Sequence, residues 1–174
     1  EDRIIALTDE EALAGTTRQR ELIAEGEMIF VGNEAESVPV ESVMGKVVVM
    51  LADRSLNPER RILLESKQAI AVLIVTDDAT IVRGIREDSS RDRIALASEL
   101  EDVFFSIVTH DAMARAFGAQ RWSDLVLSAQ KEGFTPIDLA AKANIEASSV
   151  RRDFTSFNIV GRLAGTRPDA KAVL

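Results

Sequence analysis

The sequence predicts a mixed α/β fold, a compact sheet or open barrel flanked by short helices. Two uninterrupted apolar runs, 47–51 and 69–75, have the length and residue types of buried strands. Between them Asn57 and Pro58 favour a helix start, because asparagine is a preferred N-cap and proline a preferred first helical residue. Strands this continuously apolar are covered on both faces, so this β-α-β unit favours a parallel or mixed sheet.

The chain before this unit predicts two short helices, a strand and a connection. Thr8 and Glu11 fit a capping box that begins a short helix, and a second helical stretch runs through 18–24. The apolar run 28–31 predicts a buried strand. From 34 to 42 the polar chain predicts a surface connection, in which Pro39 interrupts strand pairing.

The chain after this unit predicts alternating helices and strands. Residues 80–93 indicate a helix and a loop, 103–108 a strand, and Thr109 the cap of a helix that Gly118 ends. A further helix is expected with Ser123 as N-cap, a hydrophobic staple between Trp122 and Leu127, and its end at Gly133. From 134 to 163 the chain is β-prone, with period-two alternation from Val150 to Leu163.

The net charge of −8 on 174 residues lies at one end of the chain. Residues 1–41 hold 11 acidic and 3 basic side chains, and the acidic and basic residues of the remainder cancel. This pattern argues against a nucleic-acid surface, which needs uncompensated Lys and Arg. The nearest basic cluster, Arg83, Arg86, Arg91 and Arg93, is interleaved with acidic residues and is interpreted as a solvated, salt-bridged surface. No apolar run is long enough for a membrane span.

Few residues are candidates for chemistry. His110, the one histidine, is the conventional candidate for a catalytic base, but its place at a helix start favours a structural or surface role. Asp77 and Asp78 follow a strand, where α/β sheets often place functional groups, yet aspartate is also a common turn former, and we favour the turn. Gly45 and Lys46 precede a strand, the reverse of the order in a phosphate loop.

The remaining composition predicts no metal site and an ordinary core. One histidine and no cysteine make a zinc site improbable in these residues, and we assign no catalytic, cofactor-binding or metal-binding residue. The methionines, phenylalanines and the one tryptophan are dispersed, which predicts core positions. The methionines are Met28, Met44, Met50 and Met113.

The end of the chain predicts a hairpin that is cut short. Residues 157–165 indicate a strand, 166–169 a turn and 171–174 a second strand of four residues. Such a hairpin leaves unpaired backbone groups and apolar side chains that a complete sheet would cover. The chain is therefore expected to be a piece of a longer protein.

The middle of the chain resembles a protease-associated domain, a module of secreted peptidases and transferrin-receptor-like proteins. The resemblance covers roughly 27–118 and lies in the runs 28–32, 45–49, 57–68 and 69–75 and in the later strand at 105–107. The family pattern has an arginine-glycine after its first valine-rich strand and a glycine before its second. This chain instead has Asp53-Arg54-Ser55 and Gln68-Ala69-Ile70 at those places, so no peptide-contacting role is carried over to Arg54.

The tail resembles the segment that enters the catalytic domain of clan MH zinc aminopeptidases. The similar residues are 157–165, Pro168-Asp169 and 171–174. In that family the last of these strands leads into a histidine and an aspartate that bind zinc, so the resemblance implies zinc in a catalytic domain missing from this chain. It implies three parts: an N-terminal helical segment (1–26), a protease-associated-like domain (27–155) and the first strands of a truncated peptidase domain (156–174).

The resemblance implies a non-catalytic module of a periplasmic or extracellular aminopeptidase. Its partners would be its own peptidase domain and, in the whole enzyme, peptide substrates whose access it shapes. An alternative is a stand-alone interaction module that associates, with itself or another chain, by strand addition through the C-terminal hairpin. A third hypothesis, a small carboxylate enzyme, would use Asp77 or Asp78.

Overall fold

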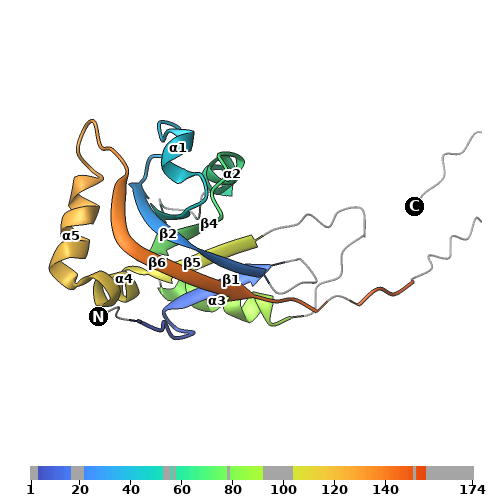
Figure 1. The fold of residues 1–174 in the computed structure, drawn as a ribbon. Helices are drawn as coiled ribbons and strands as arrows, with labels where there is room; N and C mark the ends of the chain where they lie inside the picture. Colours follow the sequence, from blue (N-terminus) through green and yellow to red (C-terminus); the bar gives the residue numbers. More distant parts are fainter. Residues whose placement is uncertain are drawn as a thin grey trace, which may run out of the picture.

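A computed structural model describes residues 4–16, 22–52, 56, 58–77, 79–91, 104–150 and 152–155. Within these ranges one six-stranded mixed sheet is surrounded by helices (Figure 1), so the predicted mixed α/β class is confirmed. The strands are β1 (Ala12–Thr16), β2 (Leu22–Gly32), β3 (Val47–Leu51), β4 (Ala71–Thr76), β5 (Phe104–Thr109) and β6 (Ile137–Ala147). The helices are α1 (Val40–Val43), α2 (Pro58–Ser66), α3 (Ala79–Ser89), α4 (His110–Phe117) and α5 (Ala119–Ser128).

The sheet has the strand order β1-β5-β4-β3-β2-β6. The four central strands are parallel, and the edge strands β1 and β6 are antiparallel to β5 and β2. The pairing of β3 with β4 runs from Val47 opposite Ala71 to Leu51 opposite Val75, which confirms the predicted β-α-β unit. The sheet curls into a half-barrel, and β1 and β6 approach each other.

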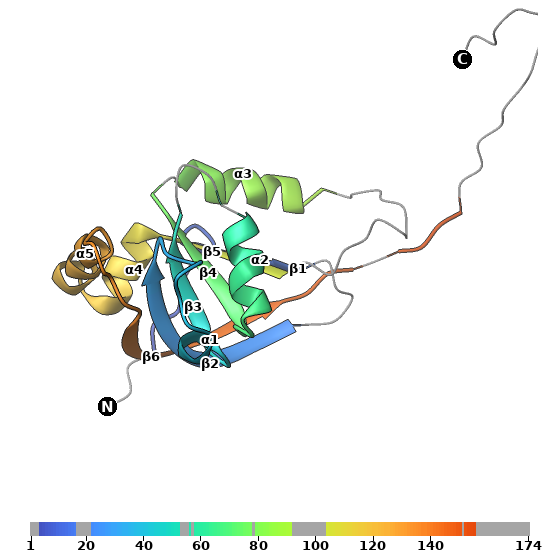
Figure 2. The same cartoon turned by 90° about the horizontal axis from the view of Figure 1, so that it is seen from above.

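Both faces of the central strands are buried, as the continuous apolar runs predict. Successive residues of β3 point to opposite faces, so Val49 and Val48 belong to different core clusters. The inner cluster is closed by residues of α4 and α5, which lie together at one end of the sheet (Figure 2). The outer cluster is covered by Val43 of α1 and Leu64 of α2.

Both predicted N-terminal helices are wrong. The Thr8–Glu11 contacts of a capping box do form, since the Glu11 carboxylate accepts from the Thr8 N–H at 2.8 Å, but they close a turn and β1 follows. Residues 22–24 of the second predicted helix belong to β2, which continues beyond residue 27 to Gly32. A local hydrogen-bond motif fits either outcome, and strand pairing with β5 and β6 decides between them.

Helix α5 begins earlier and ends earlier than predicted. Gly118 (φ +89°) ends α4, as expected, and also precedes the first residue of α5, so Ser123 lies inside the helix and is not its N-cap. The helix ends at Ser128, five residues before Gly133, which adopts φ +74° in the following turn. Burial of Trp122 against the sheet explains the shift, because the ring is a core contact of the helix.

The connection from 34 to 42 is more ordered and more buried than predicted. It contains buried Ala35 and Val38, and α1 begins directly after Pro39. The Lys67 ammonium explains how this polar backbone packs against α2. Its Nζ donates to the carbonyl oxygens of Ala35 (2.7 Å), Glu36 (3.0 Å) and Val38 (2.8 Å).

The β-prone C-terminal region forms β6, with period-two burial from Ile137 to Ala147. Residues 148–150 and 152–155 are described but form no strand, and the greater part of the predicted alternation, from 156 to Leu163, lies outside the described residues. The predicted hairpin at 157–174 lies outside the described residues. Most predicted core aromatics and methionines are buried or half-buried, but Met44 is 52% exposed and Phe154 65% exposed, which corrects two of those assignments.

Candidate functional site

The carboxyl ends of the parallel strands β4 and β5 bring the two sequence-predicted candidates together. Strand β4 ends at Thr76 and is followed by Asp77, and β5 ends at Thr109 and is followed by His110. The Thr109 hydroxyl accepts from the Ala112 N–H at 3.2 Å, so the predicted N-cap of α4 is confirmed. Asp78 lies outside the described residues.

Both ring nitrogens of His110 face a partner. Its Nδ1 accepts from the Trp122 indole N–H at 3.1 Å, and its Nε2 lies 3.4 Å from Asp77 Oδ1. Since the indole N–H can only donate, Nδ1 carries no hydrogen and the ring hydrogen is on Nε2, toward Asp77. In this geometry neither nitrogen is left to take a proton from a nucleophile.

Trp122 connects this pair to the core. It is buried, meets Phe30 edge-to-face at a centroid distance of 5.6 Å and stacks on Phe117 at 6.5 Å. The sequence placed Trp122 before a helix, so it gave no signal that the indole would bind a histidine from the neighbouring helix. That contact depends on the packing of α4 against α5.

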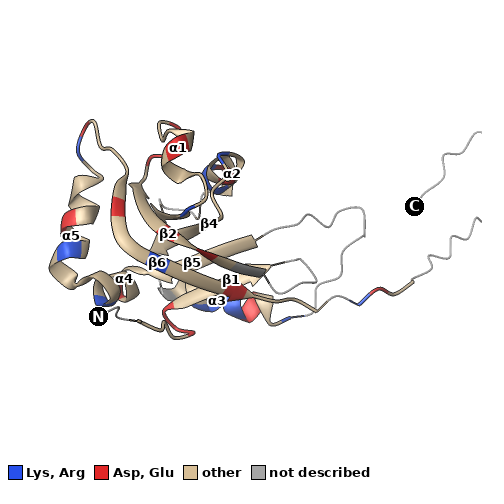
Figure 3. Cartoon of the chain, in the orientation of Figure 1, with Lys and Arg blue, Asp and Glu red and all other residues tan. Residues whose placement is uncertain are grey.

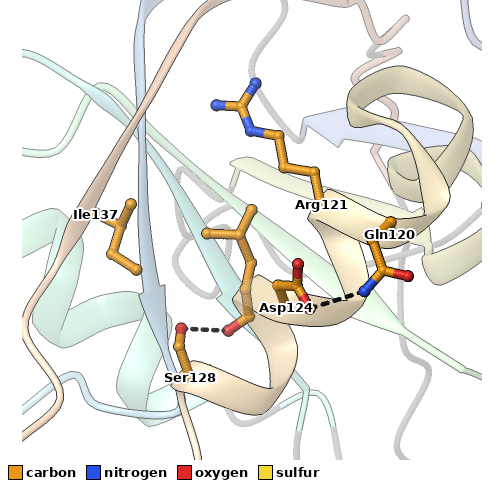
Figure 4. A pocket seen from close by; sticks show the side chains of 6 residues that line it. Gln120, Arg121, Asp124, Ser128 and Ile137 are labelled. Carbon is orange, nitrogen blue, oxygen red and sulfur yellow. Dashed lines mark hydrogen bonds between the residues drawn. The ribbon is translucent and has the colours of Figure 1, made fainter.

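An open groove lies beside this cluster, between α5 and the start of β6 (Figure 4). It has a volume of about 480 Å³, within the range of small-ligand pockets. Two of its lining residues are apolar, Leu125 and Ile137. The others are Gln120, Arg121, Asp124 and Ser128.

The polar groups of the groove bind within the molecule. The Gln120 amide donates to Asp124 Oδ1 at 3.0 Å, and the Ser128 hydroxyl donates to the Leu125 carbonyl at 2.6 Å. Arg121 donates to the Leu139 carbonyl at 2.8 Å and lies over the Phe117 ring at 5.5 Å. The polar lining residues are therefore held in internal hydrogen bonds, and the remaining lining residues, Leu125 and Ile137, are apolar.

Arg121 supports an irregularity in β6. Pairing with β2 jumps from Glu27–Lys142 to Ile29–Asp138, and inside this bulge Ala140 adopts φ +51°. The Arg121 guanidinium binds a bulge carbonyl, that of Leu139, and the Asp138 carboxylate accepts from the Ala140 N–H at 2.7 Å. The bulge fixes the strand that forms one wall of the groove.

Charged side chains of both signs are mixed on α3, α5 and β6 (Figure 3). Arg83 and Arg91 are exposed as predicted, and Arg93 lies outside the described residues. Arg86 departs from the prediction, because its Nη2 is buried and has no hydrogen-bond partner within the described ranges.

In the part of the chain that the structure describes, no three His, Asp or Glu side chains gather to hold a metal ion. The described helices include none long and apolar enough to cross a bilayer. No family model, no curated protein and no solved structure matches the chain.

Proposed function

We propose that this chain is the non-catalytic, protease-associated region of an exported zinc aminopeptidase, where it shapes the access of peptide substrates to the catalytic domain. The observation that carries the proposal is the parallel order β2-β3-β4-β5, formed by the residues on which the resemblance rests. Helix α2 connects β3 and β4 as the resemblance implies.

A second observation concerns the place where the family pattern has a glycine before its second strand. Gln68 lies there and adopts φ +67°, the left-handed region that glycine favours. The Gln68 N–H donates to the Glu65 carbonyl at 2.9 Å, and the Ala69 N–H donates to the Leu64 carbonyl at 3.3 Å. These bonds form the turn that commonly ends a helix at a glycine. The sequence differs from the family pattern at Gln68, but the backbone conformation there is one that glycine favours, and this supports the proposal.

The described residues suit a role in shaping access better than a role in chemistry. The ring nitrogens of His110 are both engaged, and the polar groups of the α5–β6 groove bind one another or the backbone. Loops and helices on a rigid sheet can restrict or orient a peptide without supplying a reacting group.

An activity assay of the purified chain tests the proposal. Aminoacyl reporter substrates are offered with and without added zinc, and we expect no turnover above that of buffer with the same zinc. Turnover that a chelator abolishes and zinc restores would contradict the proposal, since it would place the catalytic site in this chain.

A variant separates the proposal from a carboxylate enzyme. Replacing Asp77 and Asp78 by alanine is expected to leave the chain equally inactive toward these reporters. Activity in the parent chain that this double replacement removes would favour the carboxylate enzyme.

A further inference from the structure

His110 lies between two partners that respond differently to its protonation. The Trp122 indole needs an acceptor at Nδ1, which only the neutral imidazole offers. The Asp77 carboxylate lies with Oδ1 3.4 Å from Nε2 and attracts a positive charge on the ring. One ring therefore joins a group that stabilises its neutral form to a group that stabilises its charged form.

The two partners differ in burial, so protonation of the His110 ring costs more free energy at Trp122 than at Asp77. Trp122 is 3% exposed, so an indole N–H that loses its acceptor has little access to water. The Asp77 side chain is 89% exposed and can rearrange toward an imidazolium at little cost. Protonation at Nδ1 would thus leave two N–H donors facing each other at the buried end of the ring.

Among the described residues, the other charged groups of the neighbouring elements are committed elsewhere or are exposed. On α4, Asp111 is exposed, and Arg115 donates to the Glu11 carboxylate. On α5, Arg121 donates to the Leu139 carbonyl. From the end of β4, Asp77 is the carboxylate that faces the ring.

We propose that His110 is an acid-sensitive latch for α5. In the neutral state the Trp122–His110 hydrogen bond ties α5 to the start of α4. When the ring takes up a proton, that bond breaks, the imidazolium stays with Asp77, and α5 is held less firmly against the sheet. Histidine is the side chain that changes charge between roughly pH 5 and 8, so the latch would respond to mild acid.

The latch would also act on the groove beside it. Leu125 and Asp124 lie on the same helix as Trp122, and they line the groove whose opposite wall is Ile137. The residues of a helix move together, so a movement of α5 changes the width of the groove between α5 and Ile137. The inference rests on the His110 contacts alone and holds whether or not the chain belongs to a peptidase.

Nuclear magnetic resonance of the ¹⁵N-labelled chain tests the latch, because the chain has one histidine and one tryptophan. Between about pH 8 and pH 5, the imidazole nitrogens should change from the Nε2–H tautomer to the imidazolium. The indole N–H resonance should move with the same midpoint. Its hydrogen exchange, corrected for the intrinsic effect of pH, should become about tenfold faster, as loss of roughly one hydrogen bond implies.

Two variants assign the change to the latch. In His110→Asn the amide oxygen, bonded to Cγ as Nδ1 is, can accept the indole N–H at every pH, so the indole resonance should not change with pH. Asp77→Asn removes the charge beside Nε2 and keeps the Trp122–His110 bond, so the indole resonance should still change together with the protonation of the ring.

Three results would overturn the latch. The first is an indole resonance that stays fixed while the imidazole protonates, and the second is an unchanged acid transition of the indole resonance in His110→Asn. The third is a ring that stays neutral until the whole fold is lost. The first and third are read on the parent chain, so the test does not depend on the variants folding.

Discussion

Gln68 and Ala140 are the residues other than glycine that adopt a positive φ within the described ranges. Each has a hydrogen-bonded setting that holds it there: the turn after α2 for Gln68, and the Asp138 carboxylate for Ala140. A side chain in this region costs about 1–2 kcal/mol, and glycine avoids most of that cost.

Replacing Gln68 by glycine should therefore stabilise the protein by about 0.5–1 kcal/mol, the relief of strain less the greater freedom of glycine in the unfolded chain. Ser66→Gly, inside the last turn of α2, is the matched control and should destabilise by about 1 kcal/mol. Urea unfolding measures both changes. A destabilised Gln68→Gly would show that the Gln68 side chain does more than occupy the turn.

Arg61 is a buried cation that joins α2 to the start of β5. Its Nη1 donates to the Phe104 carbonyl at 2.9 Å and to the Glu65 carboxylate at 2.6 Å. Arg61→Ala should destabilise by about 1.5–3 kcal/mol, because it leaves a buried carbonyl without its donor. Arg60→Ala, at the half-buried neighbouring position, should destabilise by less than about 1 kcal/mol. Equal effects of the two replacements would refute this role of Arg61.

Among the elements, the N-terminal strand β1 depends on a glycine. A Cβ at Gly15 would lie 2.4 Å from Cζ of Phe105, so the ring occupies the space that a side chain would need. Gly15 faces Phe105 in the antiparallel pairing of β1 with β5. Gly15 is thus the residue that lets this strand pair closely with β5.

Gly15→Ala should destabilise the protein by about 1–3 kcal/mol, the range for overpacking. Gly84→Ala is the control, because a Cβ there meets nothing within 4 Å. It lies inside α3 and should stabilise by up to about 1 kcal/mol. The added replacement Phe105→Leu should recover part of the loss in Gly15→Ala. No recovery in a thermal or urea unfolding series would mean that the ring is not the obstacle.

The turn before β1 is fastened to α4 by the Glu11 carboxylate. The Thr8 N–H and the Arg115 guanidinium both donate to it and hold the pKa of Glu11 below its usual range. Because the folded pKa lies below the unfolded one, this carboxylate stabilises the fold above its unfolded pKa. That contribution is lost as pH falls through the folded pKa.

Glu11→Gln should therefore lower the urea midpoint at neutral pH and flatten its dependence on pH in the acid range. The neighbouring Glu10→Gln is the control and should leave the acid range as steep as in the parent chain. An equally steep acid range in Glu11→Gln would place the responsible carboxylate elsewhere.

The sequence correctly predicted the elements whose burial or ends follow from a local pattern of residues. The runs at 47–51 and 69–75 are apolar on both faces, and Thr109 and Gly118 have local roles at the ends of α4. Strand β1 was missed because the Thr8–Glu11 motif makes the same hydrogen bonds in a turn as at a helix start. The start of α5 was predicted wrongly because the position of Trp122 depends on how α5 packs against another helix, which the local sequence does not show.

The candidate site was predicted in part, for the same physical reason. Asp77 and His110 each follow a strand, and parallel neighbours bring such positions together. The Trp122–His110 bond and the α5–β6 groove depend on how α5 packs, which no local pattern records.

At the scale of the whole molecule, a curled sheet holds the candidate residues without a described catalytic centre. The four parallel strands form a rigid frame, α1 and α2 cover one face, and α4 and α5 close the other at one end. In the proposed function this frame would hold the helices and loops that shape access to a catalytic domain. The proposed family also makes its most specific prediction at this scale.

The codons that follow Leu174 in the reading frame test most directly whether the chain belongs to a zinc aminopeptidase. The proposal predicts a continuing frame that encodes a histidine and an aspartate close together within a few positions, where the resembled aminopeptidases bind zinc. A stop codon, or a continuing domain without that pair, would contradict the assignment to a zinc aminopeptidase.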